Sequence, residues 1–172
     1  METAVRRLLT ALTVPTALTA LALLATPWTT AHADADHEAR VPLLAGYKQE
    51  CGACHTAYAP GLLPATSWAR LMDGLPRHFG ADASLDPAML KTLQVWLAQN
   101  AATRRGEGEA QGAQEAPPED RITRAPWFVR EHRKVASEVW LRPAVRSASN
   151  CGACHAQAAD GRYSEHDVRI PR

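Results

Sequence analysis

Two copies of one pentapeptide, Cys51-Gly-Ala-Cys-His55 and Cys151-Gly-Ala-Cys-His155, contain all four cysteines of this chain of 172 residues. In a Cys-x-x-Cys-His motif, the thiols can bond two carbons at one porphyrin edge, and the histidine can bind the iron. Residues three and four apart share a helix face, so the three side chains of each copy are expected to project together. The repeat predicts two covalently bound haem c groups, one on Cys51, Cys54 and His55 and the other on Cys151, Cys154 and His155.

Two other interpretations explain the cysteines less completely. Disulfide bonds are possible in an exported protein, but they give no reason for a histidine after each pair. A zinc site made of four cysteines also leaves both histidines unused and would have to close a long loop. Haem attachment uses every one of these residues.

The N-terminus is typical of a secretory signal peptide, and we predict that residues 1–35 are removed on export to the periplasm. Arg6-Arg7 precedes an apolar run from Leu8 to Ala25, and small-residue cleavage sites follow near Ala33. The alternative is an uncleaved membrane anchor that holds the protein facing the periplasm, although this run is at the short limit for a span. The net charge is only +1, which gives no electrostatic case for a nucleic acid partner.

The periodicity of apolar residues predicts an all-α protein with two haem domains, at residues 36–101 and 121–172. In the first domain we expect a helix over residues 41–51 and a short helix through Trp68 that is capped by Thr66 or Ser67 and ends at Gly74. A third helix is expected to start at Asp86-Pro87 and to run to about residue 100. This order of elements resembles the class I cytochrome c fold.

The rest of the chain divides into a linker and a small second domain. Residues 102–120 hold no large apolar side chain, which is typical of a flexible linker. The second domain is shorter than the roughly 60 residues that can easily bury an independent core, so we expect it to wrap its haem. We predict one helix in it, from Pro126 to about Leu141, and a largely irregular tail.

Two histidines outside the motifs are the leading candidates for the sixth iron ligand. His132 falls on the apolar face of its expected helix, where an imidazole without a partner would be costly. His78 lies in a loop after the short helix, where the chain could return over the first haem. Chain proximity pairs His78 with His55 and His132 with His155, and the crossed pairing is the alternative. Core packing is the default expectation for Met72 and Met89, with Met72 the runner-up sixth ligand for the first haem, and His166 is expected on the surface.

Longer strings resemble the dihaem cytochrome c family, which comprises small periplasmic c-type cytochromes with two histidines on each iron. The strings are Tyr47-Lys-Gln-Glu-Cys-Gly-Ala-Cys-His-Thr-Ala-Tyr-Ala-Pro-Gly-Leu-Leu-Pro64, Ser67-Trp68, His78-Phe-Gly-Ala-Asp-Ala-Ser-Leu85, Arg121-Ile-Thr-Arg-Ala-Pro-Trp-Phe-Val-Arg-Glu-His-Arg133, Asn150-Cys-Gly-Ala-Cys-His155 and Val168-Arg-Ile-Pro171. The resemblance implies a class I-like N-terminal haem domain and a smaller, largely irregular C-terminal haem domain. Position by position, it also places the distal histidines at His78 and His132.

The resemblance further implies electron transfer from a membrane b-type cytochrome to a small soluble monohaem cytochrome that binds oxygen. We therefore expect a monomeric electron carrier, not an enzyme. The alternatives are a dihaem peroxidase-like enzyme and a haem-based gas-binding protein, either of which would keep one iron open.

Overall fold

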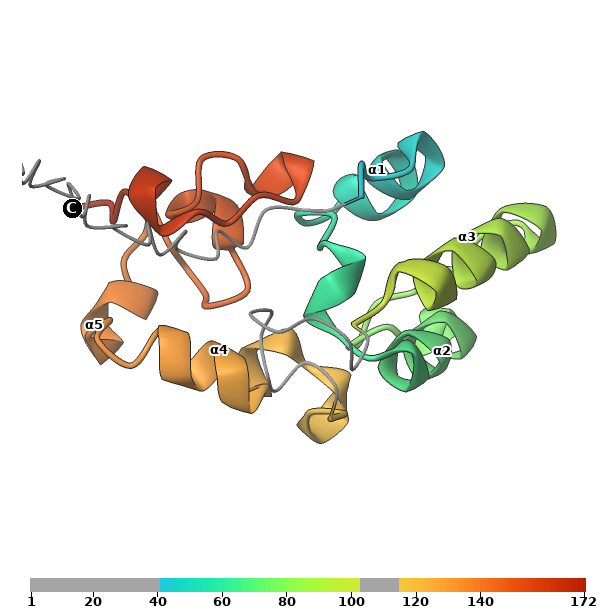
Figure 1. Cartoon of the computed structure of the whole chain (residues 1–172), viewed down its shortest axis with the longest axis horizontal. Helices are drawn as coiled ribbons and strands as arrows, with labels where there is room; N and C mark the ends of the chain where they lie inside the picture. The colour runs from blue at the N-terminus through green and yellow to red at the C-terminus, as the bar shows by residue number, and fades with distance from the viewer. Residues whose placement is uncertain (1–40, 103–114) are drawn as a thin grey trace, which may run out of the picture. The chain divides into compact units, whose positions relative to one another are not determined.

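The computed structural model describes residues 41–102 and 115–172, and the predicted signal peptide and most of the predicted linker lie outside these ranges. Its α-helices (Figure 1) are α1 (Ala45–Gly52), α2 (Ala65–Asp73), α3 (Pro87–Asn100), α4 (Pro126–Glu131) and α5 (Ser137–Trp140). Short 3-10 helices connect them: η1 (Pro60–Leu62), η2 (Leu75–Arg77), η3 (Pro118–Asp120), η4 (Ile122–Arg124), η5 (Cys151–Ala153), η6 (Ala158–Asp160) and η7 (Glu165–Asp167). The described residues form isolated β-bridges but no strand, so the all-α prediction is confirmed. None of their helices combines the length and the apolar character needed to cross a bilayer.

The helix α3 begins where the sequence predicted it. The Asp86 carboxylate accepts hydrogen bonds from the backbone N–H groups of Ala88 and Met89, both at 3.0 Å. Pro87 occupies the first helical position, where the missing N–H costs nothing and the fixed φ suits the helix. The cap and the proline together explain why α3 starts at this point.

Replacing Asp86 with alanine is expected to lower the free energy of unfolding by about 1 kcal/mol, because two N–H groups at the helix start lose their acceptor. Chemical denaturation followed by far-UV circular dichroism would measure the change. Asp82→Ala is the matched control, since Asp82 accepts bonds from Ser84 in the same loop but caps no helix. Equal losses in the two variants would contradict this role of Asp86.

The helix α2 ends as predicted but starts earlier. Its first residue is Ala65, and the preceding residue Pro64 is extended, with its carbonyl accepting the N–H groups of Ser67 and Trp68. The prediction that Thr66 or Ser67 caps this helix is therefore wrong, because both residues lie inside it. Ser67 is fully buried and accepts a side-chain hydrogen bond from Arg70. Gly74 ends the helix, and its N–H donates to two carbonyls of the last turn.

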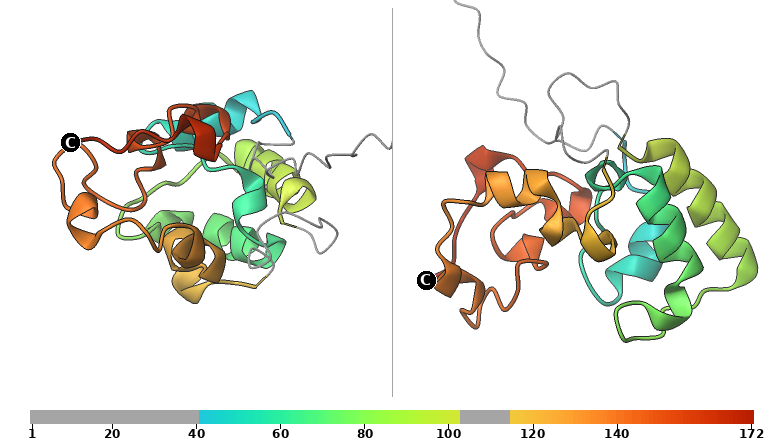
Figure 2. Two further views of the ribbon diagram at one scale, coloured as in Figure 1. Left: turned by 60° about the vertical axis from the view of Figure 1, so that its left-hand side comes forward. Right: turned by 90° about the horizontal axis from the view of Figure 1, so that it is seen from below.

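Helices α2 and α3 lie side by side (Figures 1 and 2), and the core of the first half is built around them. Leu93 and Leu97 of α3 have no exposed surface. Tyr47 of α1 is 2% exposed and packs its ring against Trp68 and Trp96. The full set of buried residues in this cluster is Tyr47, Ala57, Leu63, Trp68, Met72, Leu75, Leu93, Leu97 and Ala101.

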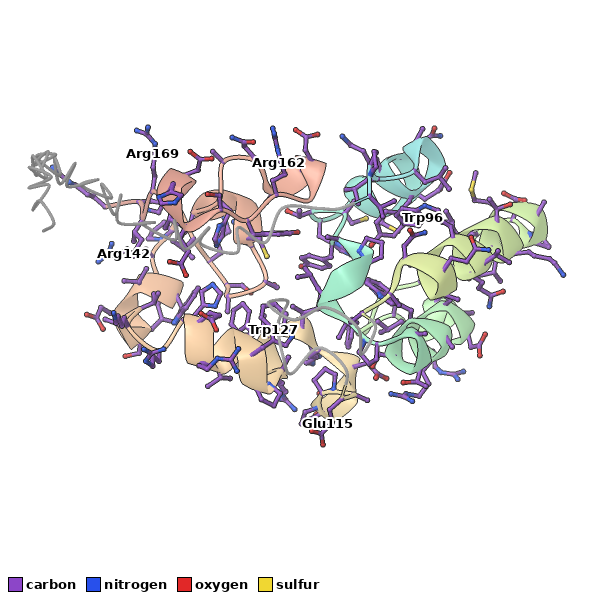
Figure 3. All side chains as sticks on the ribbon, in the orientation of Figure 1. Trp96, Glu115, Trp127, Arg142, Arg162 and Arg169 are labelled. Atoms are coloured by element: carbon purple, nitrogen blue, oxygen red, sulfur yellow. The ribbon has the colours of Figure 1, made fainter. Side chains whose placement is uncertain are left out.

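The second half has a much smaller core and one unexpected break. Among the described residues, its buried cluster consists of Ala125, Trp127 and Phe128, and Val139, Val145 and Ala158 are buried outside that cluster. Trp127 lies on α4 (Figure 3), and Leu62 and Ala102 of the first half pack against its cluster. The single helix expected from Pro126 to Leu141 is wrong, because α4 ends at Glu131 and α5 starts at Ser137.

The break has a physical reason. The Phe128 carbonyl accepts both the backbone N–H and the ring Nδ1 of His132, and the chain then turns back on itself. This brings the Trp140 ring to 5.9 Å from that of His132. A continuous helix would separate two residues eight positions apart by about 12 Å along its axis. The turn therefore allows Trp140 to cover His132, which a straight helix cannot do.

Contacts across the chain join the two halves, which fall within one compact unit, Ala33–Arg172. The Arg70 guanidinium holds the Asp120 carboxylate with two hydrogen bonds, the Nε–Oδ2 bond being 2.8 Å long, and this lowers the pKa of Asp120. The end of the predicted linker is thus fixed to α2. Lys48 of α1 pairs with Asp160 at 2.9 Å. The division into haem domains at 36–101 and 121–172 stays a prediction.

Candidate functional site

The first Cys-x-x-Cys-His motif continues the helix α1. This helix ends at Gly52, and Ala53 still has helical backbone angles. The backbone N–H of His55 reaches the Cys51 carbonyl at 3.5 Å, one helical turn back. The expectation that helical spacing gathers the three side chains on one side is consistent with this conformation.

The second motif has a different local structure. It forms the 3-10 helix η5, in which the Cys151 carbonyl accepts the N–H groups of both Cys154 and His155, at 3.2 Å and 2.8 Å. The C-terminal tail holds it, because Arg169 N–H donates to the Cys154 carbonyl at 2.9 Å and Val168 forms a bridge with His155. The expectation of an α-helix is therefore wrong for this copy. Even so, the N–H of His155 bonds to the Cys151 carbonyl just as the N–H of His55 bonds to the Cys51 carbonyl in the first copy.

The four thiols of the two motifs form no disulfide bond with one another. Burial raises the pKa of Cys51 and of Cys151 to about 11. An unreacted thiol at either position is therefore less acidic than reactive and zinc-bound cysteines, which are thiolates. Within residues 41–102 and 115–172, no group of three or more His, Cys, Asp or Glu side chains is placed to hold a metal ion.

The structure brings the predicted histidines together in two pairs. The ring centres of His55 and His78 are 6.1 Å apart and their planes differ by 22°. The rings of His132 and His155 are 6.2 Å apart, and their planes differ by 73°. These are the same pairs that chain proximity suggested.

The two separations match the geometry of a single metal ion bound between two imidazoles. A metal–nitrogen bond to histidine is about 2.0–2.1 Å long, and the ring centre lies about 1.1 Å beyond the nitrogen, so two opposed ligands have ring centres about 6.2–6.4 Å apart. Imidazoles in van der Waals contact through their faces would be closer, at about 4 Å. The separation in each pair is therefore the one expected if the two imidazoles bind one ion, such as a haem iron, between them.

Hydrogen bonds fix which nitrogen of two of these histidines can bind a metal. His55 Nδ1 lies 2.7 Å from the Thr56 carbonyl oxygen, and His132 Nδ1 lies 2.9 Å from that of Phe128. Because a carbonyl oxygen only accepts, each Nδ1 must carry the proton, and Nε2 then holds the lone pair. Such a partner on the other ring nitrogen is typical of histidines that bind metals. The residues present thus fit two irons with histidine ligands.

A tight turn presents His78. Ala81 N–H donates to the His78 carbonyl at 3.0 Å, and Phe79 and Gly80 between them have φ angles of 49° and 97°. Positive φ at both central residues is the geometry of a type I′ turn. Glycine adopts it freely, whereas a phenylalanine there is strained, as is common near functional sites. Phe79 contacts the His78 ring, and the Arg121 guanidinium lies 4.2 Å from the centre of the Phe79 ring.

The other candidate ligands lie elsewhere. Met72 is 5% exposed and belongs to the core of the first half. Met89 packs against that core and approaches Gly46. The expected core packing of both methionines is confirmed. His166 is exposed in η7, as predicted.

Besides Phe79 at His78, aromatic rings contact the other three histidines of the two pairs. Phe128 stacks on His132 at 4.0 Å, with planes 20° apart, in keeping with the sequence pattern that puts both residues on one helix face. Tyr58 stacks on His55 at 4.9 Å with planes 18° apart. Tyr163 contacts the His155 ring edge to face at 5.6 Å. No local pattern links Tyr163 to that histidine.

Comparison with known proteins identifies related chains. The family model described as dihaem cytochrome c matches residues 47–163, which include both motifs and both histidine pairs. A search of curated proteins found no match.

Solved structures of proteins from two organisms are similar to this chain. The diheme cytochrome type c from Shewanella baltica has a TM-score of 0.62 at 35% sequence identity, over 74% of this chain and 92% of that one. The diheme cytochrome c from Rhodobacter sphaeroides has a TM-score of 0.59 at 39% identity, over 72% of this chain and 100% of that one. A second structure from R. sphaeroides has a TM-score of 0.55 at 41% identity, over 69% and 95% of the two chains.

Proposed function

Because the chain belongs to the dihaem cytochrome c family, we propose that it is a periplasmic electron carrier in which two histidines bind each iron. It is an electron-transfer cytochrome with two covalently bound haem c groups. In this proposal Cys51 and Cys54 attach the first haem, between His55 and His78. Cys151 and Cys154 attach the second, between His155 and His132. The observation that carries the proposal is the ring-centre separation of 6.1 Å and 6.2 Å in the two pairs.

The histidine pairs favour a carrier over an enzyme. Haem iron supplies a one-electron couple between its ferric and ferrous states. Two imidazoles on opposite sides of an iron leave it no position for peroxide, oxygen or carbon monoxide. A second histidine in place of methionine also keeps the reduction potential low. Both properties suit a protein that passes electrons on without binding a substrate.

The direction of electron flow and the location are part of the proposal. We expect a membrane b-type cytochrome as the donor and a small soluble monohaem cytochrome that binds oxygen as the acceptor, on the basis of the family resemblance. The predicted signal peptide at residues 1–35 supports a periplasmic location. Reduction of the acceptor by this protein, followed by stopped-flow absorption, would test the partner.

Removing one distal histidine is expected to open one iron. The oxidised wild-type protein should show two low-spin EPR signals: a rhombic one from the nearly parallel pair, and one with a large maximum g value from the steeply crossed pair. In His78→Ala a high-spin signal should replace the rhombic signal. In His132→Ala a high-spin signal should replace the signal with the large maximum g value. Each variant should bind one carbon monoxide after reduction, because one axial position becomes free.

The exposed His166 provides the matched control. His166→Ala should keep both low-spin signals and bind no carbon monoxide. A wild-type protein with a high-spin iron that binds carbon monoxide would favour the peroxidase-like or gas-binding alternative. Unchanged spin states in His78→Ala or His132→Ala would remove that residue from the ligand set.

A further inference from the structure

Tyr58 is in contact with the first site and with the second half of the chain at the same time. It lies three residues after His55, and its ring stacks on that imidazole at 4.9 Å with planes 18° apart. This is an offset-stacked geometry of the kind that aromatic pairs prefer. An imidazole bound through Nε2 can still rotate about the metal–nitrogen bond. A ring lying on its face opposes that rotation.

The other end of Tyr58 reaches the second motif. Its hydroxyl donates to the Ser149 carbonyl at 2.7 Å, across 91 positions of the chain. The sulfur of Cys151 lies 3.7 Å from the same carbonyl oxygen. The residue that stacks on His55 is therefore hydrogen-bonded to the backbone two residues before the second attachment cysteine.

The backbone of Tyr58 is held independently of its side chain. The Tyr47 hydroxyl donates to the Tyr58 carbonyl at 2.7 Å, and Tyr47 is only 2% exposed. The core of the first half thus fixes the backbone of Tyr58, and the second half of the chain fixes its hydroxyl.

The second site is built differently. Phe128 stacks on the distal histidine, His132, and both belong to the same half of the chain. Tyr163 meets His155 at an interplanar angle of 73°, so it does not lie on the face of that ring. The Tyr58 stack is tied by a hydrogen bond to the opposite half of the chain.

We propose that Tyr58 is a positioning residue that sets the plane of the His55 imidazole and couples it to the segment Ser149–Cys151. The orientation of the first iron's ligands then depends on the second half of the chain. The orientation of the second iron's ligands does not depend on Tyr58 in the same way. This inference rests on the proposed role of His55 as an iron ligand.

Two substitutions separate the roles of the ring and the hydroxyl. Tyr58→Leu removes the stack and the hydrogen bond, and the rhombic EPR signal of the first iron is expected to broaden and to shift in all three g values. Tyr58→Phe keeps the stack and loses only the bond to Ser149. It should give a smaller shift of the same signal. In both variants the signal with the large maximum g value should stay unchanged.

Redox titration gives a second readout. The midpoint potential assigned to the first iron should move in both variants, by more in Tyr58→Leu, because the ligand plane affects the iron d orbitals. Thr92→Val is the matched control: it also removes a hydroxyl that donates to a backbone carbonyl, at 2.9 Å, but on α3 and away from both motifs. It should change neither the EPR spectrum nor the potentials. A thermal melt of each variant would show whether any shift merely follows a loss of stability.

The outcomes are distinct. If Tyr58→Leu and wild type have superimposable rhombic signals and equal potentials, Tyr58 does not position His55. This inference then fails, while the proposed function stands. If both EPR signals of Tyr58→Phe move together, the residue supports the whole structure instead of one ligand plane. If the wild-type protein lacks two low-spin signals, the proposed function itself fails.

Discussion

In the double variant Cys151→Ala/Cys154→Ala, which lacks both thiols of the second motif, residues 121–172 should lose their stable fold. The first half should keep its own fold. In the described part of the second half, the buried cluster consists of Ala125, Trp127 and Phe128, with Val139, Val145 and Ala158 buried apart from it. A segment below about 60 residues buries too little surface to fold easily alone. The covalent haem must therefore supply much of the apolar surface against which this segment packs. The haem content should fall from two to one per chain, measured by the pyridine haemochrome and by intact mass.

Limited proteolysis with mass mapping would locate the unfolded part, with cleavage concentrated beyond Arg121. The comparison is Cys51→Ala with Cys54→Ala, which removes the first haem but leaves the larger cluster around Leu93 and Leu97. We expect this variant to keep more helix by circular dichroism. A second half that resists protease equally well with and without its thiols would show that its haem is not part of its core.

Truncating Leu97 to alanine is expected to lower the free energy of unfolding by about 2–5 kcal/mol. The side chain has no exposed surface and lies in the cluster that joins α2 and α3. Part of the loss is the transfer of its methyl groups to water, and part is the cavity left in a packed core. Guanidinium denaturation followed by circular dichroism would measure it.

Val95 on the same helix is the matched control, because 50% of it is exposed. Val95→Ala should change the free energy of unfolding by no more than about 0.5 kcal/mol. Similar losses at the two positions would mean that α3 is not packed as the structure has it. The attachment of both haems should be unaffected in either variant.

The chemistry of the site could be predicted from the sequence because its signals are local. Each pentapeptide contains two thiols and an imidazole within five residues, so their proximity does not depend on the rest of the fold. The start of α3 was equally clear, since Asp86 and Pro87 act on the N–H groups directly after them. His78 and His132 were identified in part by their local setting and in part by the family resemblance.

Other features could not be predicted, because long-range contacts decide them. The break after α4 depends on Trp140 folding back over His132, and helix propensity alone gives no sign of it. The second motif forms a 3-10 helix, and the C-terminal tail binds it through Val168 and Arg169. The bond from Tyr58 to Ser149 spans 91 positions, and such a bond has no local signature.

The sequence by itself therefore determined which groups are present at each site: two attachment motifs, the candidate distal histidines and the helices that begin and end on short-range signals. Only the tertiary structure decided how these groups face one another, with one histidine pair nearly parallel and the other steeply crossed. The physical reason is that the orientation of an imidazole depends on the rings and carbonyls packed around it. Those neighbours come from distant parts of the chain, and only folding brings them together.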